Sequence, residues 1–317
     1  MGEEKQILYV DATGLKNLAC SRKYSLAVLN GFIPKGSQNK VATFFGSCLH
    51  KFAEEFYLND KSVPAALGPM IQMWNDKEDV LQYKQGNFGN QYLNSAKLME
   101  CAHAVGKYLT NDVDTEILTK DEHVCTELKF AIPFKQDDKF EVVVCGTIDK
   151  MVKINRGTYS LGDYKFTRQW GDPNKYLNAY KLDPQPRLYW WAIKWMAKHT
   201  QSEFYDQLVS MPLGFFIDAG FHSKNDFKIQ RSEVFYDSDS NEDEFDAMLN
   251  AAVNEIIEIA KIKDGYPARE GIIKGCCKTI YGECDFASVC QASNKGAANA
   301  VLGSRFEYRE FNPLTQW

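Results

Sequence analysis

The stretch "KFEVVVCGTIDKMVKINRGTYSLGDYKF", residues 139–166, decides the fold class. Its two apolar runs are rich in Val, Ile, Phe and Tyr, the residues that favour strands. The "NRG" turn at residues 155–157 separates the runs and supplies a glycine for the left-handed position of a three-residue hairpin loop. Asp149 and Asp163 each lie seven residues from Arg156. The stretch therefore predicts a β-hairpin in which the two aspartates face each other.

This facing pair of aspartates predicts a cation site. Opposed side chains on neighbouring strands have Cβ atoms roughly 5 Å apart, and like charges at that distance destabilise a sheet unless something offsets them. Lys165 follows Asp163 by two residues and so shares its face of the strand. Carboxylate oxygens are the ligands that Mg²⁺ and Mn²⁺ prefer. The alternative is an edge hairpin in a slightly different register, with its acids exposed to solvent.

The rest of the chain predicts helices on both sides of the hairpin, and further strands. Apolar residues at helical spacing predict helices at about 13–20, 40–58, 63–118, 184–198 and 240–263. Thr13 would cap the first of these helices, and Ser240 or Asn241 the last. Further strands are expected at 126–134, 208–219 and 226–236. This order predicts an α/β or α+β class, and the region 63–118, which has no catalytic signature, is interpreted as packing or an insertion.

Length and composition indicate a soluble, folded protein. The 317 residues are 44% hydrophobic and 25% charged, which is ordinary for a globular chain. The densest apolar run, "LYWWAIKWMA", is too short for a membrane span, and the first residues do not resemble a secretory leader. Nine cysteines without such a leader favour thiols or metal ligands over disulfides. The expected location is a reducing cytoplasm.

The net charge of −5 does not indicate a nucleic-acid partner, because phosphate binding usually leaves a basic footprint. Acidic residues elsewhere can still hide a local patch. Basic residues gather in two stretches, at Lys16, Arg22 and Lys23, and at Arg168, Lys175, Lys181 and Arg187. On charge alone, a scattered solvated surface is the preferred explanation of these residues, ahead of a binding patch.

Four segments together resemble a known family. "GTIDKMV" followed by "LGDYKF" resembles motifs II and III of the PD-(D/E)xK nuclease superfamily, particularly its RecB-type branch. "GSCLHKFAEEF" resembles the helix that carries the histidine of motif I, at His50. "QPRLYWWAI" resembles the helical Gln-x-x-x-Tyr motif, at Gln185 and Tyr189, which are four residues apart and share a helix face. The segments occur in the order that the family shows.

The resemblance implies a fold and an activity. The fold would be a restriction-endonuclease-like α/β core, a central mixed sheet flanked by helices, in a single nuclease domain over 1–317 with a helical insertion at about 63–118. The activity would be Mg²⁺- or Mn²⁺-dependent hydrolysis of DNA, as an exonuclease in recombination, repair or phage DNA processing. The substrate would be single-stranded DNA or duplex ends, and compact chains of this kind are common in phages, which would place the protein in the host cytoplasm.

The resemblance also implies roles for individual residues. His50, Asp149, Asp163 and the Tyr164 carbonyl would hold the metal, and Lys165 would position or help deprotonate a water and neutralise a phosphate oxygen. Gln185 and Tyr189 would orient Lys165 or the DNA backbone. Glu127, in the strand "TELKF", could be a further acidic neighbour or an exposed strand residue.

The cysteines extend the resemblance over nearly the whole chain. Cys277, Cys284 and Cys290 have the spacing C-x6-C-x5-C, and Cys20 lies in "ACSRKYSL" near the other end. RecB-type nucleases with a [4Fe-4S] cluster use one cysteine before motif I and three after the last motif. Four thiolates suit such a cluster better than zinc, because close C-x2-C knuckles are absent. Cys276 adjoins Cys277, so either could be the ligand.

Buried small side chains are the simplest interpretation of the other four cysteines, Cys48, Cys101, Cys125 and Cys145.

Two other functions are less consistent with this sequence. A nuclease-like scaffold that binds DNA or a recombination partner without cutting would be expected to lack a metal ligand or the lysine, and this sequence keeps them. An iron–sulfur redox protein would not need the aspartates and Lys165. The sequence leaves cleavage polarity, strand preference and oligomeric state open.

Overall fold

The computed structural model describes most of the chain, in two compact units. The described residues are 5–37, 40–78, 81, 92–154, 157–168, 172–210, 213–235, 239–262, 265–279 and 282–314. The terminal unit comprises Met1–Ser37, Lys129–Gly146 and Asp239–Trp317. The central unit comprises Gln38–Leu128 and Thr147–Ser238. Asn155 and Arg156 of the predicted turn lie outside the described residues, whereas Gly157 has the left-handed φ of 81° that such a turn requires.

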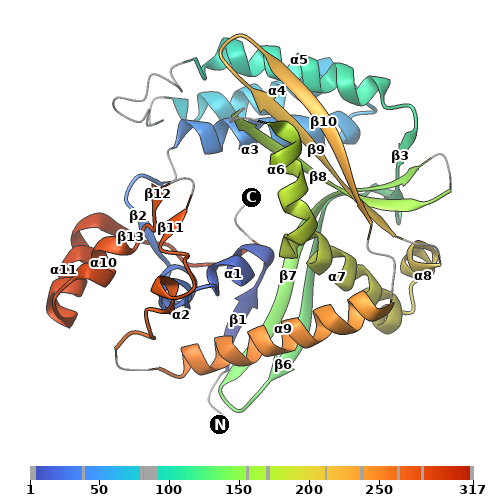
Figure 1. Cartoon of the computed structure of the whole chain (residues 1–317). Coiled ribbons are helices and arrows are strands. Elements are labelled where there is room, and N and C mark those ends of the chain that lie inside the picture. Colours follow the sequence, from blue (N-terminus) through green and yellow to red (C-terminus); the bar gives the residue numbers. More distant parts are fainter. Residues whose placement is uncertain are drawn as a thin grey trace. The chain divides into compact units, whose positions relative to one another are not determined.

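The described strands pair in the order β1-β7-β8-β9-β10, with parallel and antiparallel neighbours (Figure 1). β1 (Gln6–Val10) runs parallel to the first part of β7 (Phe140–Ile154), and the last part of β7 pairs antiparallel with β8 (Tyr159–Arg168). β9 (Gly214–His222) is parallel to β8 and antiparallel to β10 (Phe227–Phe235). Both β3 (Thr115–Ile117) and β6 (Thr126–Gln136) also pair with β7. The predicted α/β class with a central mixed sheet flanked by helices is confirmed.

The central unit buries a mainly aromatic and aliphatic core around α3 (Val41–Leu58). α3 contacts α4 (Val63–Asn75), α5 (Ser95–Asn111) and β8. Its buried side chains recur at helical spacing, which is why the periodicity predicted this helix within one residue. The unit also contains α6 (Pro173–Ala179), α7 (Pro184–Thr200) and α8 (Glu203–Val209). α4, α5 and β3 lie within 63–118; that this range is an insertion in a single domain stays a prediction.

The prediction for the first helix is wrong in two respects. It is interrupted at Cys20: α1 (Ala12–Asn17) ends before this residue and α2 (Ser21–Tyr24) begins after it. The Asp11 carboxylate, rather than the Thr13 hydroxyl, caps α1 by accepting the Gly14 N–H at 2.6 Å. Cys20 itself has extended backbone angles, with φ −139° and ψ 113°. The break leaves its thiol between two short helices.

The terminal unit continues with short elements and one long helix. α9 (Asp239–Ala260) is amphipathic, as its apolar spacing predicted. The remaining elements are the π-helical turn η1 (Ser25–Leu29), β2 (Phe32–Pro34), η6 (Glu270–Ile272), β11 (Lys278–Thr279), β12 (Gly282–Glu283), α10 (Ala287–Gln291), α11 (Lys295–Arg305) and β13 (Phe306–Tyr308). Leu26, Phe286 and Phe306 lie in a small apolar cluster of this unit. Segments from the early and the late parts of the chain therefore share a small core in this unit.

Four of the nine cysteines, Cys48, Cys101, Cys125 and Cys145, are buried and unpaired, as predicted.

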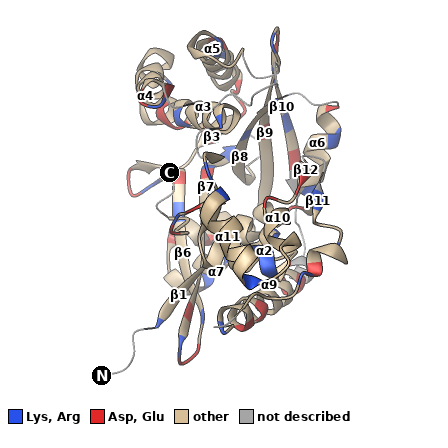
Figure 2. Cartoon of the chain, turned by 90° about the vertical axis from the view of Figure 1, so that its left-hand side faces the viewer, with Lys and Arg blue, Asp and Glu red and all other residues tan. Residues whose placement is uncertain are grey.

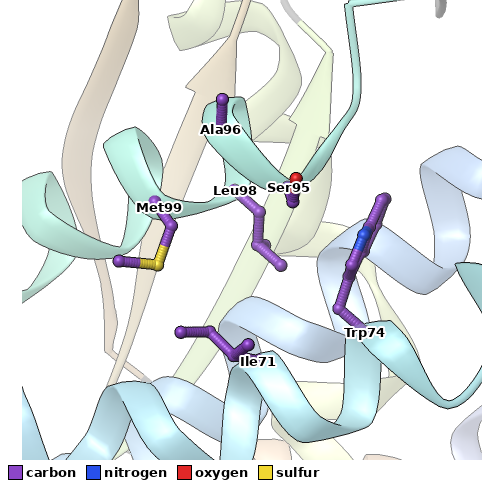
Figure 3. A pocket seen from close by; sticks show the side chains of 6 residues that line it. All are labelled: Ile71, Trp74, Ser95, Ala96, Leu98 and Met99. Carbon is purple, nitrogen blue, oxygen red and sulfur yellow. The ribbon is translucent and has the colours of Figure 1, made fainter.

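A pocket of about 220 Å³ between α4 and α5 is lined by Ile71, Trp74, Ser95, Ala96, Leu98 and Met99 (Figure 3). None of these side chains is titratable, and most of them are apolar. Lys and Arg residues occur on several elements, α6 among them (Figure 2). No helix among the described residues is both long and apolar enough to cross a bilayer.

Candidate active site

Asp149 of β7 and Asp163 of β8 face each other in the central unit. Lys150 of β7 pairs with Gly162 of β8. The next pair away from the turn is therefore Asp149 opposite Asp163, as their equal separation from Arg156 predicted. Asp149 Oδ2 accepts a hydrogen bond from the Tyr164 backbone N–H at 2.7 Å. Asp163 is only 1% exposed, and the Asp149 side chain only 11%. The hairpin therefore buries two acids side by side.

Burial gives this pair unusual protonation behaviour. The pKa of Asp163 is raised to about 6, chiefly by burial and also by the charge of nearby Asp149, while Lys165 opposes both effects. The pKa of Asp149 is also raised, again because of burial, although Lys165 and the Tyr164 N–H favour its charged form. Two buried carboxylates with raised pKa values favour a cation as a neighbour. The donor set, hard oxygens beside one imidazole, suits Mg²⁺ or Mn²⁺.

Lys165 supplies the positive charge next to the acids. Its Nζ lies 2.5 Å from Asp163 Oδ2, and its side chain is 23% exposed. Burial alone would lower the pKa of Lys165, but the charges of Asp163 and Asp149 more than offset this and raise it. Asp163 Oδ2 accepts no well-oriented hydrogen bond within the described part of the chain, so the ion pair leaves a lone pair for a metal.

His50 reaches the pair from α3. Its Nδ1 lies 3.4 Å from Asp149 Oδ2. Burial lowers the pKa of His50 to about 4, and Lys165 contributes in the same direction. The imidazole is therefore neutral near pH 7, which is the form that binds metals.

Glu127 of β6 completes a compact group with His50 and Asp149. Each of the three offers a ligand atom within 4.8 Å of the others. Glu127 has φ 49°, a left-handed conformation that is rare and strained for a non-glycine residue. Of the two roles that the sequence left open for Glu127, the acidic neighbour is the one that fits this geometry. Asp163 lies outside the group, held by Lys165 and Gln185.

Gln185 and Tyr189 reach the site from the first turns of α7. The Asp183 carboxylate caps this helix by accepting the Gln185 backbone N–H at 2.9 Å. Gln185 Nε2 donates to Asp163 Oδ1 at 2.8 Å and to Tyr189 Oη at 2.9 Å. The shared helix face was predicted, but the hydrogen-bonding target of Gln185 in this structure is Asp163 rather than Lys165. Both residues thus contribute to fixing the Asp163 carboxylate.

Two tyrosines that the sequence analysis did not identify adjoin the lysine. Tyr176 of α6 and Tyr180, in the short 3-10 helix η5 (Tyr180–Leu182), have their hydroxyl oxygens 2.9 Å apart. The Lys165 Nζ lies 5.9 Å from the centre of the Tyr180 ring. The available signal was the four-residue spacing in "KYLNAYK", which places both rings on one helix face. The hydrogen-bonded tyrosine pair thus lies next to the Lys165 ammonium group.

The raised pKa of Asp163 gives a stability prediction. A carboxyl whose pKa is near 4 when unfolded and about 6 when folded stabilises the fold when protonated, and that contribution is lost as the pH rises through about 6. Asp163→Asn should therefore raise the free energy of unfolding of the metal-free protein at pH 7.5, by on the order of 1–3 kcal/mol. The gain should shrink at pH 5. Urea unfolding in EDTA measures both values.

The exposed Glu116 of β3 provides the control for this prediction. Glu116→Gln removes a carboxylate from the same unit and should leave the unfolding free energy unchanged at both pH values. If Asp163→Asn destabilises the protein at pH 7.5 by as much as at pH 5, the account of the buried acid pair is wrong.

The five remaining cysteines lie in the terminal unit. A Cβ atom on Gly271 would lie 3.0 Å from the sulfurs of both Cys276 and Cys277 and 3.3 Å from that of Cys20, so these sulfurs converge on one point. Burial raises the pKa of the Cys277 thiol, and the nearby thiols of Cys20, Cys284 and Cys290 raise it further. Among the described residues, the sulfurs form no group of three within 4.8 Å of one another.

A family model matches most of the chain, and solved structures of low sequence identity resemble it. The model of the PD-(D/E)XK nuclease superfamily matches residues 16–291, a span that contains every site residue described above. No curated protein matches the chain significantly. A solved structure from Eubacterium rectale, described as a "Putative exonuclease", is 14% identical, covers 84% of this chain and 86% of its own, and has a TM-score of 0.43. The structure of SSO0001 is 11% identical, with 83% and 81% covered and a TM-score of 0.30.

Proposed function

Because the chain belongs to the PD-(D/E)XK nuclease superfamily, we propose that it is a metal-dependent DNA nuclease that digests DNA from its ends. The observation that carries the proposal is the buried pair Asp149 and Asp163 with Lys165 at 2.5 Å from one of them. Buried acids that face each other are costly unless a cation joins them, and a lysine beside them can serve a phosphate.

The residues that would hold the metal are Asp149, Asp163, His50 and the Tyr164 carbonyl, with Glu127 as an added ligand. When bound, Mg²⁺ or Mn²⁺ lowers the pKa of a water and offsets negative charge on the phosphate. The neutral His50 imidazole and the buried carboxylates supply the donors, and the Tyr164 N–H holds Asp149 by its Oδ2.

Lys165 would act on the substrate side of the acid pair. Its ammonium group remains protonated beside two carboxylates, so it can donate to a phosphate oxygen and orient the attacking water. Gln185 holds Asp163 by its Oδ1, which keeps Oδ2 turned to Lys165. This division leaves each oxygen of Asp163 with one partner. A silent scaffold has no support from these residues, since acids and lysine are all present.

The experiment compares linear and covalently closed circular DNA of the same sequence, single- and double-stranded, with Mg²⁺ or Mn²⁺. We expect nucleotides to be released from linear DNA and the circles to remain intact. Cutting of circles at a comparable rate would replace the exonuclease with an endonuclease. No cutting of any substrate with either metal would leave the silent scaffold as the better explanation.

Glu127 provides a separate test of the ligand set. Glu127→Gln keeps the size of the side chain and removes its charge, so the Mn²⁺ concentration for half-maximal cleavage should rise by about 10-fold or more. The exposed Glu116 is a matched control, and Glu116→Gln should leave the metal requirement unchanged. An unchanged requirement in Glu127→Gln would exclude Glu127 as a ligand.

We also propose that Cys20, Cys277, Cys284 and Cys290 bind a [4Fe-4S] cluster in the terminal unit. The support is the convergence of the Cys20 and Cys277 sulfurs over Gly271 and the proximity of the other two thiols to Cys277. A cluster stands between its ligands and does not need sulfurs that touch. Cys276 is the weaker candidate, because its Sγ lies 3.6 Å from the Ala19 carbonyl oxygen in a weak hydrogen bond.

A further inference from the structure

Lys150, the residue after Asp149, is a fully buried lysine with 0% exposure. Its Nζ donates to the Asp218 carboxylate Oδ2 at 2.8 Å and to the Tyr164 hydroxyl at 2.8 Å. Lysines are almost never fully buried unless they are paired, because desolvation of the ammonium group costs several kcal/mol. The cost of burying Lys150 next to Asp149 indicates that this side chain has a specific role.

The opposite strand is adapted to this side chain. Gly162 is the cross-strand partner of Lys150. A Cβ atom at Gly162 would lie 2.6 Å from Lys150 Cε and 2.6 Å from the Phe216 ring, closer than real Cβ contacts allow. Gly162, the glycine of "LGDYKF", is therefore needed at this position, because a larger residue would collide with the Lys150 side chain.

Asp218 of β9 is the centre of a saturated network. Arg231 donates to Asp218 from Nε at 2.8 Å and from a terminal nitrogen at 2.9 Å, and Tyr108 of α5 donates from its hydroxyl at 2.7 Å. With Lys150, four donors surround one carboxylate that is 1% exposed. Arg231 also binds Asp112, the residue after α5, at 2.6 Å. The buried charges are thus fully paired, which makes the network rigid.

Tyr164 connects this network to the site. Side chains alternate along β8, so the Tyr164 ring points away from the face of Asp163 and Lys165. Its hydroxyl accepts from Lys150, while its backbone N–H donates to Asp149 Oδ2 at 2.7 Å. The ring also packs edge-on against the His50 imidazole, with centroids 6.1 Å apart.

We propose that Lys150, Asp218 and Arg231 are positioning residues that fix Tyr164, and through it the orientation of Asp149 and His50, for metal binding. The inference rests on the proposed metal site and extends it to the reverse face of the sheet. Through Tyr108 and Asp112 the network also fixes the end of α5, which gives the helical region before the hairpin a function in the site. None of the three positioning residues would contact metal or DNA.

The test is calorimetric titration of the whole protein with MnCl₂, without DNA. Tyr164→Phe removes the acceptor of the Lys150 hydrogen bond and keeps the ring and the ion pairs. We expect Mn²⁺ to bind about 10-fold more weakly, the lower end of the effect of lost outer-sphere partners. The thermal midpoint of the metal-free variant should stay near that of wild type, whereas a merely structural role would lower it without changing the affinity.

Matched variants complete the design. Tyr159→Phe, on the same strand and outside the network, should bind Mn²⁺ as wild type does. Lys150→Met should weaken binding about as much as Tyr164→Phe, and the double variant should lose no more than either, because the hydrogen bond between Lys150 and Tyr164 is the link that both variants remove. Wild-type affinity in Tyr164→Phe, or additive losses in the double variant, would overturn the inference while leaving the metal site standing. A wild-type protein that binds no Mn²⁺ would overturn both the metal site and the inference.

Discussion

Lys165→Ala is expected to lower the rate of DNA cleavage by about 10²–10⁴-fold, the range for a group that orients or transfers a proton in catalysis. The ammonium group lies 2.5 Å from Asp163, and the charges of both aspartates hold it protonated. Its removal takes away a donor to the phosphate and leaves the acid pair without its positive neighbour. Mn²⁺ should therefore bind at least as tightly as in wild type. Single-turnover digestion of end-labelled DNA and calorimetry measure the two effects separately.

Lys153→Ala is the matched control, since Lys153 is an exposed lysine on the same hairpin. It should cut DNA at the wild-type rate. A Lys165→Ala protein that retains more than about a tenth of the wild-type rate would remove Lys165 from the reaction. Loss of Mn²⁺ binding in the same variant would instead assign Lys165 to the assembly of the site.

Cys284→Ser is expected to remove iron and colour from protein purified without oxygen, and to make the terminal unit unfold at a lower temperature. Four thiolates are the usual ligands of such a cluster, so the loss of one should be enough. Cys20→Ser should have the same effect from the other end of the chain. Iron analysis, the visible spectrum and a thermal melt followed by circular dichroism provide the measurements.

Cys276→Ser is the control for the cysteine experiment, because this neighbour of Cys277 bonds weakly to the Ala19 carbonyl. It should keep iron and colour, and Cys277→Ser should lose both. If the two results are exchanged, Cys276 is the ligand. A brown protein whose iron and melting temperature survive Cys284→Ser would contradict the cluster.

The facing aspartates could be predicted because hairpin register depends on short-range counting. Asp149 and Asp163 are fixed by a turn a few residues away, and strand alternation then gives the face of Lys165. Gln185 and Tyr189 were predictable for a similar reason, since four residues along a helix return to one face. What the count could not give is the partner of Gln185, which depends on where α7 lies against β8.

The features that the sequence missed or left open depend on contacts distant in sequence or on unusual backbone. Glu127 reaches His50 and Asp149 with a left-handed φ that no propensity indicates. The charged partner of Lys150, Asp218, is 68 residues away along the chain, and a buried lysine cannot be told from an exposed one by residue type. β1 has only five residues, and the strand with which it pairs, β7, also lies far away along the chain. The cap of α1 is Asp11 rather than Thr13, and the break at Cys20, where the backbone is extended, is a separate departure from the predicted helix.

We propose that Asp149, Asp163 and Lys165 form a metal-dependent nuclease site. Digestion of end-labelled linear DNA tests this proposal directly. Wild-type protein should release labelled nucleotides with Mg²⁺ or Mn²⁺ and none in EDTA. Asp163→Asn, which is expected to fold at least as stably, should release none with either metal. Digestion that persists in EDTA, or that Asp163→Asn carries out at the wild-type rate, would contradict the account.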